Sequence, residues 1–277
     1  MKNKISITLN NKILRDVDST IDNIIIRNRS QAIEYLIKGA FKENKIAVIL
    51  AGENQKSNEK KIKQRYSVKI NHLTLIERTI KKLTNSGFKN IYIVGTNSTL
   101  TNIFKIVGNG SVFNSKIEFV NEESEEGTAA ALKLLKGKIN TTFLVVWCDV
   151  AIDNLNLNKL WQQHIQEKVT VTLLISSSIT QSDKNTGKWS YVKIEGNKIL
   201  SYIEKPLLKN LDSSIFFGGV FVAEPELFSY KGRSLEREIF PELAKKGFLG
   251  GHLSGTEYLH VHTRGDLLKI RSIIKLN

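Results

Sequence analysis

The 277-residue chain is long enough for one or two domains, and 41% of its residues are hydrophobic, enough for a sizeable core. No apolar run reaches the roughly 18 residues of a membrane-spanning helix, and the single cysteine, Cys148, excludes an internal disulfide, so we expect a cytoplasmic protein without a membrane partner. The formal net charge of +14 favours polyanionic partners such as nucleic acid or nucleotides, although a lysine-rich composition alone would give the same charge.

The first 43 residues predict one strand and two helices. Lys4 to Leu9 alternates apolar with polar residues, as a half-buried strand does. Asn10 or Asn11 is a suitable N-cap for a first helix, whose apolar residues recur at helical spacing as far as Ile24, and Ser30 is expected to cap the second helix. Because so short a segment cannot close a core alone, we expect two chains to pair their first strands in a homodimer or a higher even-numbered oligomer.

This β-α-α pattern resembles the ribbon-helix-helix repressors over residues 1–43. The resemblance implies a small DNA-binding and dimerisation domain that regulates transcription. Polar residues of the paired ribbon would enter the major groove, and the N-terminus of the second helix would hold a phosphate. The residues that the resemblance assigns to DNA are Lys4, Ser6, Thr8, Arg29 and Ser30. Two other interpretations remain open: a segment that serves only for oligomerisation, and an extra strand of the main domain.

Residues 45–277 predict a second domain in which strands alternate with helices. The expected strands of its first part are Ile46–Leu50, Asn90–Val94, Ile117–Val120, Thr142–Trp147 and Val169–Ile175, and the expected helices are Leu73–Leu83 and Gly127–Leu135. This alternation predicts a mostly parallel sheet with helices on both faces, in which ligands bind beyond the carboxyl ends of the strands. Gly52 and Asp149 each follow such a strand, so we expect them to face one pocket.

The pattern becomes more antiparallel after Trp189. The expected elements are strands at Tyr191–Ile194, Ile199–Ile203 and Gly219–Val222, a helix at Ser234–Lys246, and one or two closing strands within His252–His262. The sheet as a whole is therefore expected to be mixed.

Six short motifs of this domain resemble, in order, those of the sugar-phosphate nucleotidyltransferases. They are Leu50-Ala51-Gly52, Gly127 to Ala131, Cys148-Asp149, Glu204-Lys205-Pro206, Gly218 to Phe221, and Tyr258 to Thr263. The resemblance implies an α/β fold, a Rossmann-like three-layer sandwich with a mixed central sheet. It assigns the nucleotide to Leu50, Ala51, Gly52, Gly127 and Thr128, and the sugar and phosphate to Glu204, Lys205 and Gly219.

The reaction of that family explains its residue types. A sugar 1-phosphate attacks the α-phosphorus of a nucleoside triphosphate and pyrophosphate leaves, so catalysis depends on positioning and charge neutralisation. By the resemblance, Asp149 would hold Mg²⁺, the cofactor expected if the chain is active, and Arg65 stands where the family has a phosphate-neutralising lysine. We therefore interpret Arg65 and Asp149 as the catalytic residues.

Several positions depart from the family pattern. The loop after Gly52 lacks the family's second glycine and arginine, and Glu53 adds a negative charge there. Arg65 is not interchangeable with lysine at a tight site. His260 replaces the second metal-binding carboxylate, with His262 two residues later, and imidazole suits Zn²⁺ better than Mg²⁺. The sequence shows no matching cysteine or acidic partner for these histidines.

These departures leave three interpretations. We prefer a DNA-binding regulator whose second domain binds a nucleotide or nucleotide sugar with weak or no catalysis. The second is an active sugar-1-phosphate nucleotidylyltransferase with an N-terminal DNA-binding or oligomerisation module, and the third is a domain that binds no small molecule. Asp149 and His260 are the candidate metal ligands, whereas His72 and His164 are expected at the surface.

Overall fold

The computed structural model describes residues 5–43, 45–52, 64–124, 126–177, 189–206, 214–256 and 259–275. The chain divides into two compact units, Met1–Asn44 and Lys45–Asn277. Within the described ranges, no helix is long and apolar enough to cross a membrane.

The first unit contains two helices, α1 (Asn11–Ser19) and α2 (Arg29–Glu43). As predicted, Asn10 caps α1, because its side chain accepts a hydrogen bond from the backbone N–H of Ile13. The helix ends earlier than predicted, because the carboxylate of Asp22 accepts the N–H groups of the three following isoleucines and holds a turn.

One prediction for this unit is corrected, and another is not tested by a single chain. Residues 5–10 have no regular secondary structure in the single chain, because a lone strand leaves its backbone groups unpaired and needs a neighbour. Lys4, where the strand was expected to begin, lies outside the described residues. The cap of α2 is Asn28, whose side chain accepts the N–H of Gln31, and Ser30 lies within the first turn instead. The described residues of one chain thus form the two expected helices, and the paired ribbon stays a prediction.

The second unit is built on a mixed sheet, which in the described part of the chain has nine strands in the order β5-β4-β1-β6-β11-β8-β12-β10-β9. The bounds are β1 Lys45–Leu50, β4 Phe88–Gly95, β5 Lys116–Asn121, β6 Phe143–Trp147, β8 Val171–Ser176, β9 Ser190–Glu195, β10 Lys198–Ile203, β11 Phe216–Ala223 and β12 Leu249–Ser254. β1 lies parallel to β4 and β6, whereas β11 runs antiparallel to β6 and β8. The prediction of an α/β fold with a mixed sheet is confirmed.

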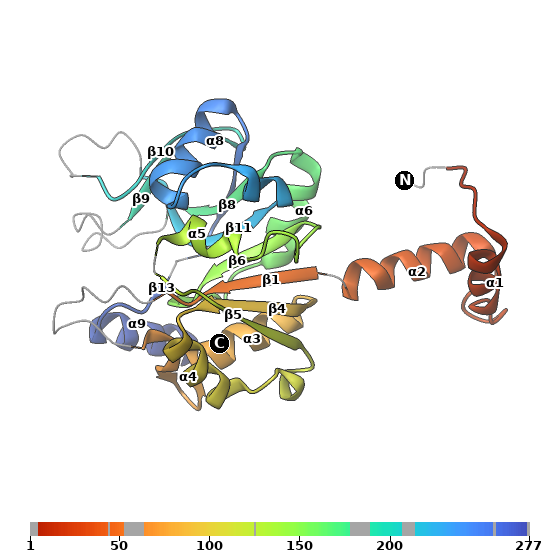
Figure 1. Cartoon of the computed structure of the whole chain (residues 1–277), viewed down its shortest axis with the longest axis horizontal. Coiled ribbons are helices and arrows are strands. Elements are labelled where there is room, and N and C mark those ends of the chain that lie inside the picture. The colour runs from red at the N-terminus through yellow and green to blue at the C-terminus, as the bar shows by residue number, and fades with distance from the viewer. Residues whose placement is uncertain are drawn as a thin grey trace. The chain divides into compact units, whose positions relative to one another are not determined.

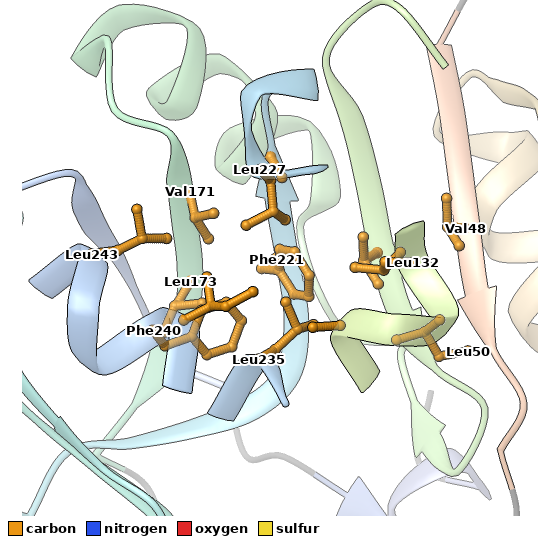
Figure 2. Packing of buried hydrophobic residues seen from close by; sticks show 14 of the residues in the cluster. Val48, Leu50, Leu132, Val171, Leu173, Phe221, Leu227, Leu235, Phe240 and Leu243 are labelled. Atoms are coloured by element: carbon orange, nitrogen blue, oxygen red, sulfur yellow. The ribbon is translucent and has the colours of Figure 1, made fainter. Parts of the chain in front are cut away.

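Helices cover both faces of this sheet (Figure 1). They are α3 (Leu75–Asn85), α4 (Asn97–Val107) and α6 (Leu157–Glu167) on one face, and α5 (Thr128–Lys133) and α8 (Phe240–Lys246) on the other. Successive residues of β1 point to opposite faces, so Ala47 and Ile49 belong to the first core, and Val48 and Leu50 to the second. Figure 2 shows the second core, where the ring of Phe240 packs 5.4 Å from that of Phe221.

Shorter elements surround the sheet. They are β2 (Lys69–Ile70), β3 (Leu73–Thr74), β7 (Val150–Ala151), β13 (Leu259–His260), α9 (Arg264–Lys275) and the short helices η1 (Arg65–Ser67), η2 (Ser111–Phe113), η4 (Pro225–Ser229) and η5 (Leu235–Ile239). The helix predicted from residue 73 begins at Leu75, because Thr74 and Glu77 form a capping box. The helix predicted from residue 234 begins as the π-helix η5 before it becomes α8.

Candidate functional site

A cleft of about 460 Å³ lies beyond the carboxyl ends of β1, β4 and β6. Gly52 and Asp149, which were predicted to face one pocket, both line it. The other lining residues that the sequence singled out are Leu50, Arg65, Gly127, Thr128, Glu204, Lys205 and His262. Ala51 does not line the cleft, because it is fully buried and its N–H donates to the carbonyl of Val94.

A smaller hollow of about 120 Å³ shares residues with this cleft. Asp149, Glu204 and Lys205 line both, while Gly219 and His260 line the hollow alone. Gly219 is required there, since its φ of 79° disfavours other residues and an added Cβ would lie 3.0 Å from Val150. The sequence-predicted residues for nucleotide, sugar and metal are therefore brought together, apart from Ala51.

Asp149 lies at the centre of a cluster of charged and polar side chains. Its Oδ2 accepts a hydrogen bond from Nη1 of Arg65 at 2.6 Å. The Nδ1 atom of His260 lies 3.9 Å from Oδ1, and that of His262 lies 3.6 Å from Oδ2. The two imidazole rings stack with centroids 5.4 Å apart. Asp149 is thus an acidic neighbour of both histidines, whereas the sequence analysis had paired it with His260 alone as a metal ligand.

Backbone pairing explains how residues so distant in sequence meet. β13 pairs antiparallel with β7, which places His260 opposite Val150. The N–H of Val261 donates to the carbonyl of Asp149, and the N–H of His262 donates to the carboxylate of Asp266. The positions of both histidines are therefore fixed by the backbone.

Electrostatics divides this cluster into an ionised carboxylate and two neutral imidazoles. Burial would raise the pKa of Asp149, but His260, His262 and Arg65 overcome this effect and hold the pKa below its ordinary value. Burial lowers the pKa of His260, and it lowers the pKa of His262 to about 4. Near pH 7 the carboxylate is therefore neutralised by Arg65 rather than by a histidine.

The cluster fits Mg²⁺ poorly. Mg²⁺ requires oxygen ligands in near-octahedral geometry, whereas Asp149 is the one oxygen donor among the three clustered side chains, and it already pairs with Arg65. The nitrogen atoms of His260 and His262 are donors that Mg²⁺ does not favour.

The Glu204-Lys205 motif follows β10. The carboxylate of Glu204 accepts a hydrogen bond from the hydroxyl of Ser190 and lies 3.2 Å from Nζ of Lys205. Lys205 has a φ of 40°, a left-handed conformation that is uncommon for a residue other than glycine. Such strained residues cluster at ligand sites, so this conformation is consistent with a functional role for the motif.

The turn at Gly127 packs tightly against residues 233–236. The carbonyl of Arg233 accepts the N–H of Ala129 at 2.9 Å. The hydroxyl of Thr128 donates to the carboxylate of Glu236 at 2.6 Å and accepts the N–H of Leu235 at 3.0 Å. The hydroxyl of Thr128 and the N–H of Ala129 are thus engaged within the protein.

The sequence analysis missed four polar residues of the cleft: Glu122, Ser234, Glu236 and Arg237. Glu236 and Arg237 belong to η5, and π-helices occur frequently at functional sites. The spacing of apolar residues does not distinguish a single π-turn from the α-helix that continues it, so the part of the cleft wall formed by η5 could not be found from the sequence. The DNA-assigned residues belong to the first unit, where Ser6, Thr8, Arg29 and Ser30 are exposed.

Comparison with known proteins assigns the second unit to a family. Residues 58–244, more than half of the chain, match the nucleotidyl transferase family. The chain belongs to this family. No curated protein matches the sequence of this nucleotidyl transferase.

Solved structures similar to this nucleotidyl transferase share its fold. One is a Bacillus anthracis protein assigned as a glucose-1-phosphate thymidylyltransferase, in complex with a sucrose. Its TM-score is 0.67 and its sequence identity is 18%, and the match covers 82% of this chain and 94% of that chain. HddC from Yersinia pseudotuberculosis complexed with GMP-PN has a TM-score of 0.67 and a sequence identity of 18%. The match covers 83% of this chain and 99% of the HddC chain. A further structure of HddC from the same organism has a TM-score of 0.66 at the same identity and coverage. At this identity the likeness shows the fold alone.

The low pKa of His262 predicts a pH-dependent stability. As the pH falls below about 6.5, the unfolded chain binds a proton at His262, whereas the folded chain does so only near pH 4. His262 alone should therefore account for a loss of about 2 kcal/mol in the free energy of unfolding between pH 7 and 4.5. Urea unfolding of His262→Asn should show a smaller loss over this interval, while His72→Asn, at an exposed position, should behave as the unsubstituted protein. An equal loss in all three proteins would refute this assignment.

Proposed function

We propose that this chain is a DNA-binding regulator whose nucleotidyl transferase domain binds a nucleotide or nucleotide sugar with weak or no catalysis. One observation carries the proposal. The cleft keeps the residues expected to bind the ligand, yet its central carboxylate, Asp149, is paired with Arg65 and is flanked by two imidazoles rather than by a second carboxylate. Binding groups are thus retained, while the oxygen ligands that Mg²⁺-dependent transfer needs are reduced.

Three cationic side chains and an open backbone support a phosphorylated ligand. Arg65, Lys205 and Arg237 are suited to phosphate oxygens, and four carboxylates, those of Glu122, Asp149, Glu204 and Glu236, line the cleft beside them. An added Cβ at Gly52 would meet no atom of the described residues within 4 Å, so this part of the structure leaves space for close approach to the backbone. HddC, complexed with GMP-PN, is a protein of the same fold that holds a nucleotide analogue. We therefore favour a nucleotide or nucleotide sugar over a neutral sugar.

Exposed apolar surface supports dimerisation through the first unit. Its buried hydrophobic residues are Val17, Ile26 and Ala32. The large hydrophobic side chains that are at least half exposed are Ile5 at 75%, Ile7 at 50%, Ile24 at 75%, Ile25 at 80% and Tyr35 at 61%. A second copy that pairs with residues 5–9 would bury part of this surface and present Ser6 and Thr8 on the opposite face of the ribbon, as in ribbon-helix-helix repressors.

Calorimetry followed by a turnover assay tests the ligand-binding function. We expect a nucleoside triphosphate or a nucleotide sugar to bind with and without Mg²⁺, and pyrophosphate release in the presence of sugar 1-phosphates to be slow or absent. Rapid Mg²⁺-dependent release would instead establish the active nucleotidylyltransferase. Failure of every nucleotide and nucleotide sugar to bind would favour a domain without a small-molecule ligand.

DNA recognition is tested by Ser6→Ala combined with Thr8→Ala. After a binding sequence is selected from random duplexes, the double variant should bind it at least about tenfold more weakly, since each base-edge contact contributes about 1–3 kcal/mol. Fluorescence anisotropy over a salt series measures the effect. Ser19→Ala, also exposed in the first unit, is the matched control and should bind normally. Unchanged specific affinity in the double variant contradicts the ribbon assignment, and a dimer that binds no DNA favours a segment for oligomerisation alone.

A further inference from the structure

Asp149, His260 and His262 have the spacing of an incompletely closed metal site. Each offers one ligand atom, and these atoms all lie within 4.8 Å of one another. Ligands bound to one ion at about 2.0–2.2 Å lie roughly 3–3.5 Å apart. The Nδ1 atoms of His262 and His260 lie 3.6 Å from Oδ2 and 3.9 Å from Oδ1 of Asp149, a few tenths of an ångström beyond this range. The widest separation among the three ligand atoms, up to 4.8 Å, would have to shorten by up to about 1.3 Å.

The surrounding structure fixes the positions of the three side chains. The pairing of β13 with β7 fixes His260 beside Val150, and the hydrogen bond from Val261 to the Asp149 carbonyl ties the two segments together. The ring of Trp189 packs edge-on against His260 at 4.8 Å. The ligand atoms therefore converge because of backbone pairing and aromatic packing, and not through a mutual ion pair alone.

The donor set determines which ions would bind. Two imidazole nitrogens and one carboxylate suit Zn²⁺ and other first-row transition ions, whereas Mg²⁺ prefers oxygen ligands. Three protein ligands leave a coordination position open, as in sites where an ion meets a ligand or water. Asp149 and His262 line the main cleft, so an open position on that side would be accessible to a phosphate oxygen.

We propose that Asp149, His260 and His262 form a site for a divalent transition ion, with one coordination position open to the cleft. The site goes beyond the proposed function, because ion binding requires neither nucleotide nor DNA. Arg65 is its competitor: the guanidinium lies 2.6 Å from Oδ2 of Asp149, the oxygen nearest to His262. The ion and Arg65 therefore compete for the same carboxylate, that of Asp149.

Titration of the untagged full chain with Co²⁺, followed by visible absorption, tests the site, with Zn²⁺ and Mg²⁺ compared by calorimetry. We expect one equivalent of Co²⁺ or Zn²⁺ to bind and Mg²⁺ to bind far more weakly. His260→Asn and His262→Asn should each weaken Co²⁺ binding at least about 100-fold. Removing a residue that hydrogen-bonds to a metal ligand already lowers metal affinity about 10–100-fold, and loss of the ligand itself costs more. Arg65→Gln should strengthen binding about tenfold, because it removes the competing cation.

The control is His72→Asn, which removes an exposed imidazole and should bind Co²⁺ as the unsubstituted chain does. Circular dichroism establishes that each variant is folded; if the buried His260 does not tolerate replacement, His262→Asn and Asp149→Asn carry the test. The proposal is overturned if the unsubstituted chain binds no Co²⁺ or if binding persists in the His262 and Asp149 variants. An equal loss in the His72 variant also overturns it, because the ion would then lie elsewhere.

Discussion

Replacing Gly127 with alanine is expected to reduce the free energy of unfolding by about 2–4 kcal/mol and to weaken nucleotide binding more than tenfold. Gly127 has a φ of 123°, and an added Cβ would lie 2.5 Å from the carbonyl oxygen of Arg233. The same carbonyl accepts the N–H of Ala129, so the clash would push residues 233–236 away from the turn and distort that wall of the cleft. Urea unfolding and calorimetry with the tightest-binding nucleotide measure the two effects.

Gly137→Ala separates the steric effect from backbone strain. Gly137 also has a positive φ, 84°, but an added Cβ there would meet nothing within 4 Å. Its replacement should destabilise the fold by only about 1–2 kcal/mol, the cost of a left-handed alanine, and nucleotide affinity should not change. If the two substitutions changed the free energy of unfolding and the nucleotide affinity equally, the turn at Gly127 would accommodate the added Cβ without distorting the cleft, and the prediction would be contradicted.

Replacing Asp149 with asparagine is expected to strengthen nucleotide binding about tenfold in a chelating buffer. The substitution removes a negative charge from the wall of the cleft and releases the guanidinium of Arg65, which now lies 2.6 Å from the carboxylate. Both effects favour an anionic ligand. Calorimetry gives the affinity, and an active nucleotidylyltransferase would instead lose pyrophosphate release by a factor of about 10²–10³.

Asp153→Asn is the matched control for this substitution. Asp153 also forms a short ion pair with an arginine, Arg78, at 2.6 Å, and its exposure is similar to that of Asp149. It does not line the cleft, so its loss should reduce stability without changing nucleotide affinity. Weaker nucleotide binding by Asp149→Asn, with Asp153→Asn unchanged, would contradict the proposed role of Arg65.

The centre of the sheet was predictable from sequence because its strands, such as β6, β8 and β11, are buried on both faces. The continuous apolar run of β1 is typical of a central parallel strand, and its alternate residues indeed reach two separate cores. α4 was missed, because Asn97, Ser98 and Thr99 at its start are residues whose side chains compete with the helical backbone. The N-terminal strand could not be tested by one chain, since its hydrogen-bonding partner would be another copy.

The site was only partly predictable. Gly52 and Asp149 were placed together by the rule that ligands bind beyond the carboxyl ends of strands. His260 and His262 reach Asp149 through two strands of two residues each, which leave no periodic signal. His164 was wrongly expected at the surface: it is buried, and its ring nitrogens bond to Thr172 and Glu224. Thr172 lies on the strand that follows the helix of His164, and Glu224 follows β11, so both partners are brought to the ring by tertiary packing.

The ion pair between Arg65 and Asp149 has a consequence for how the protein would respond to metal supply. Since the guanidinium already balances the carboxylate, the cluster carries no uncompensated charge in the absence of a metal ion. The fold then does not depend on metal, unlike a zinc finger, which unfolds when a chelator removes its zinc. Metal-free and metal-loaded forms could both persist as folded proteins, and their ratio would follow the free concentration of the ion.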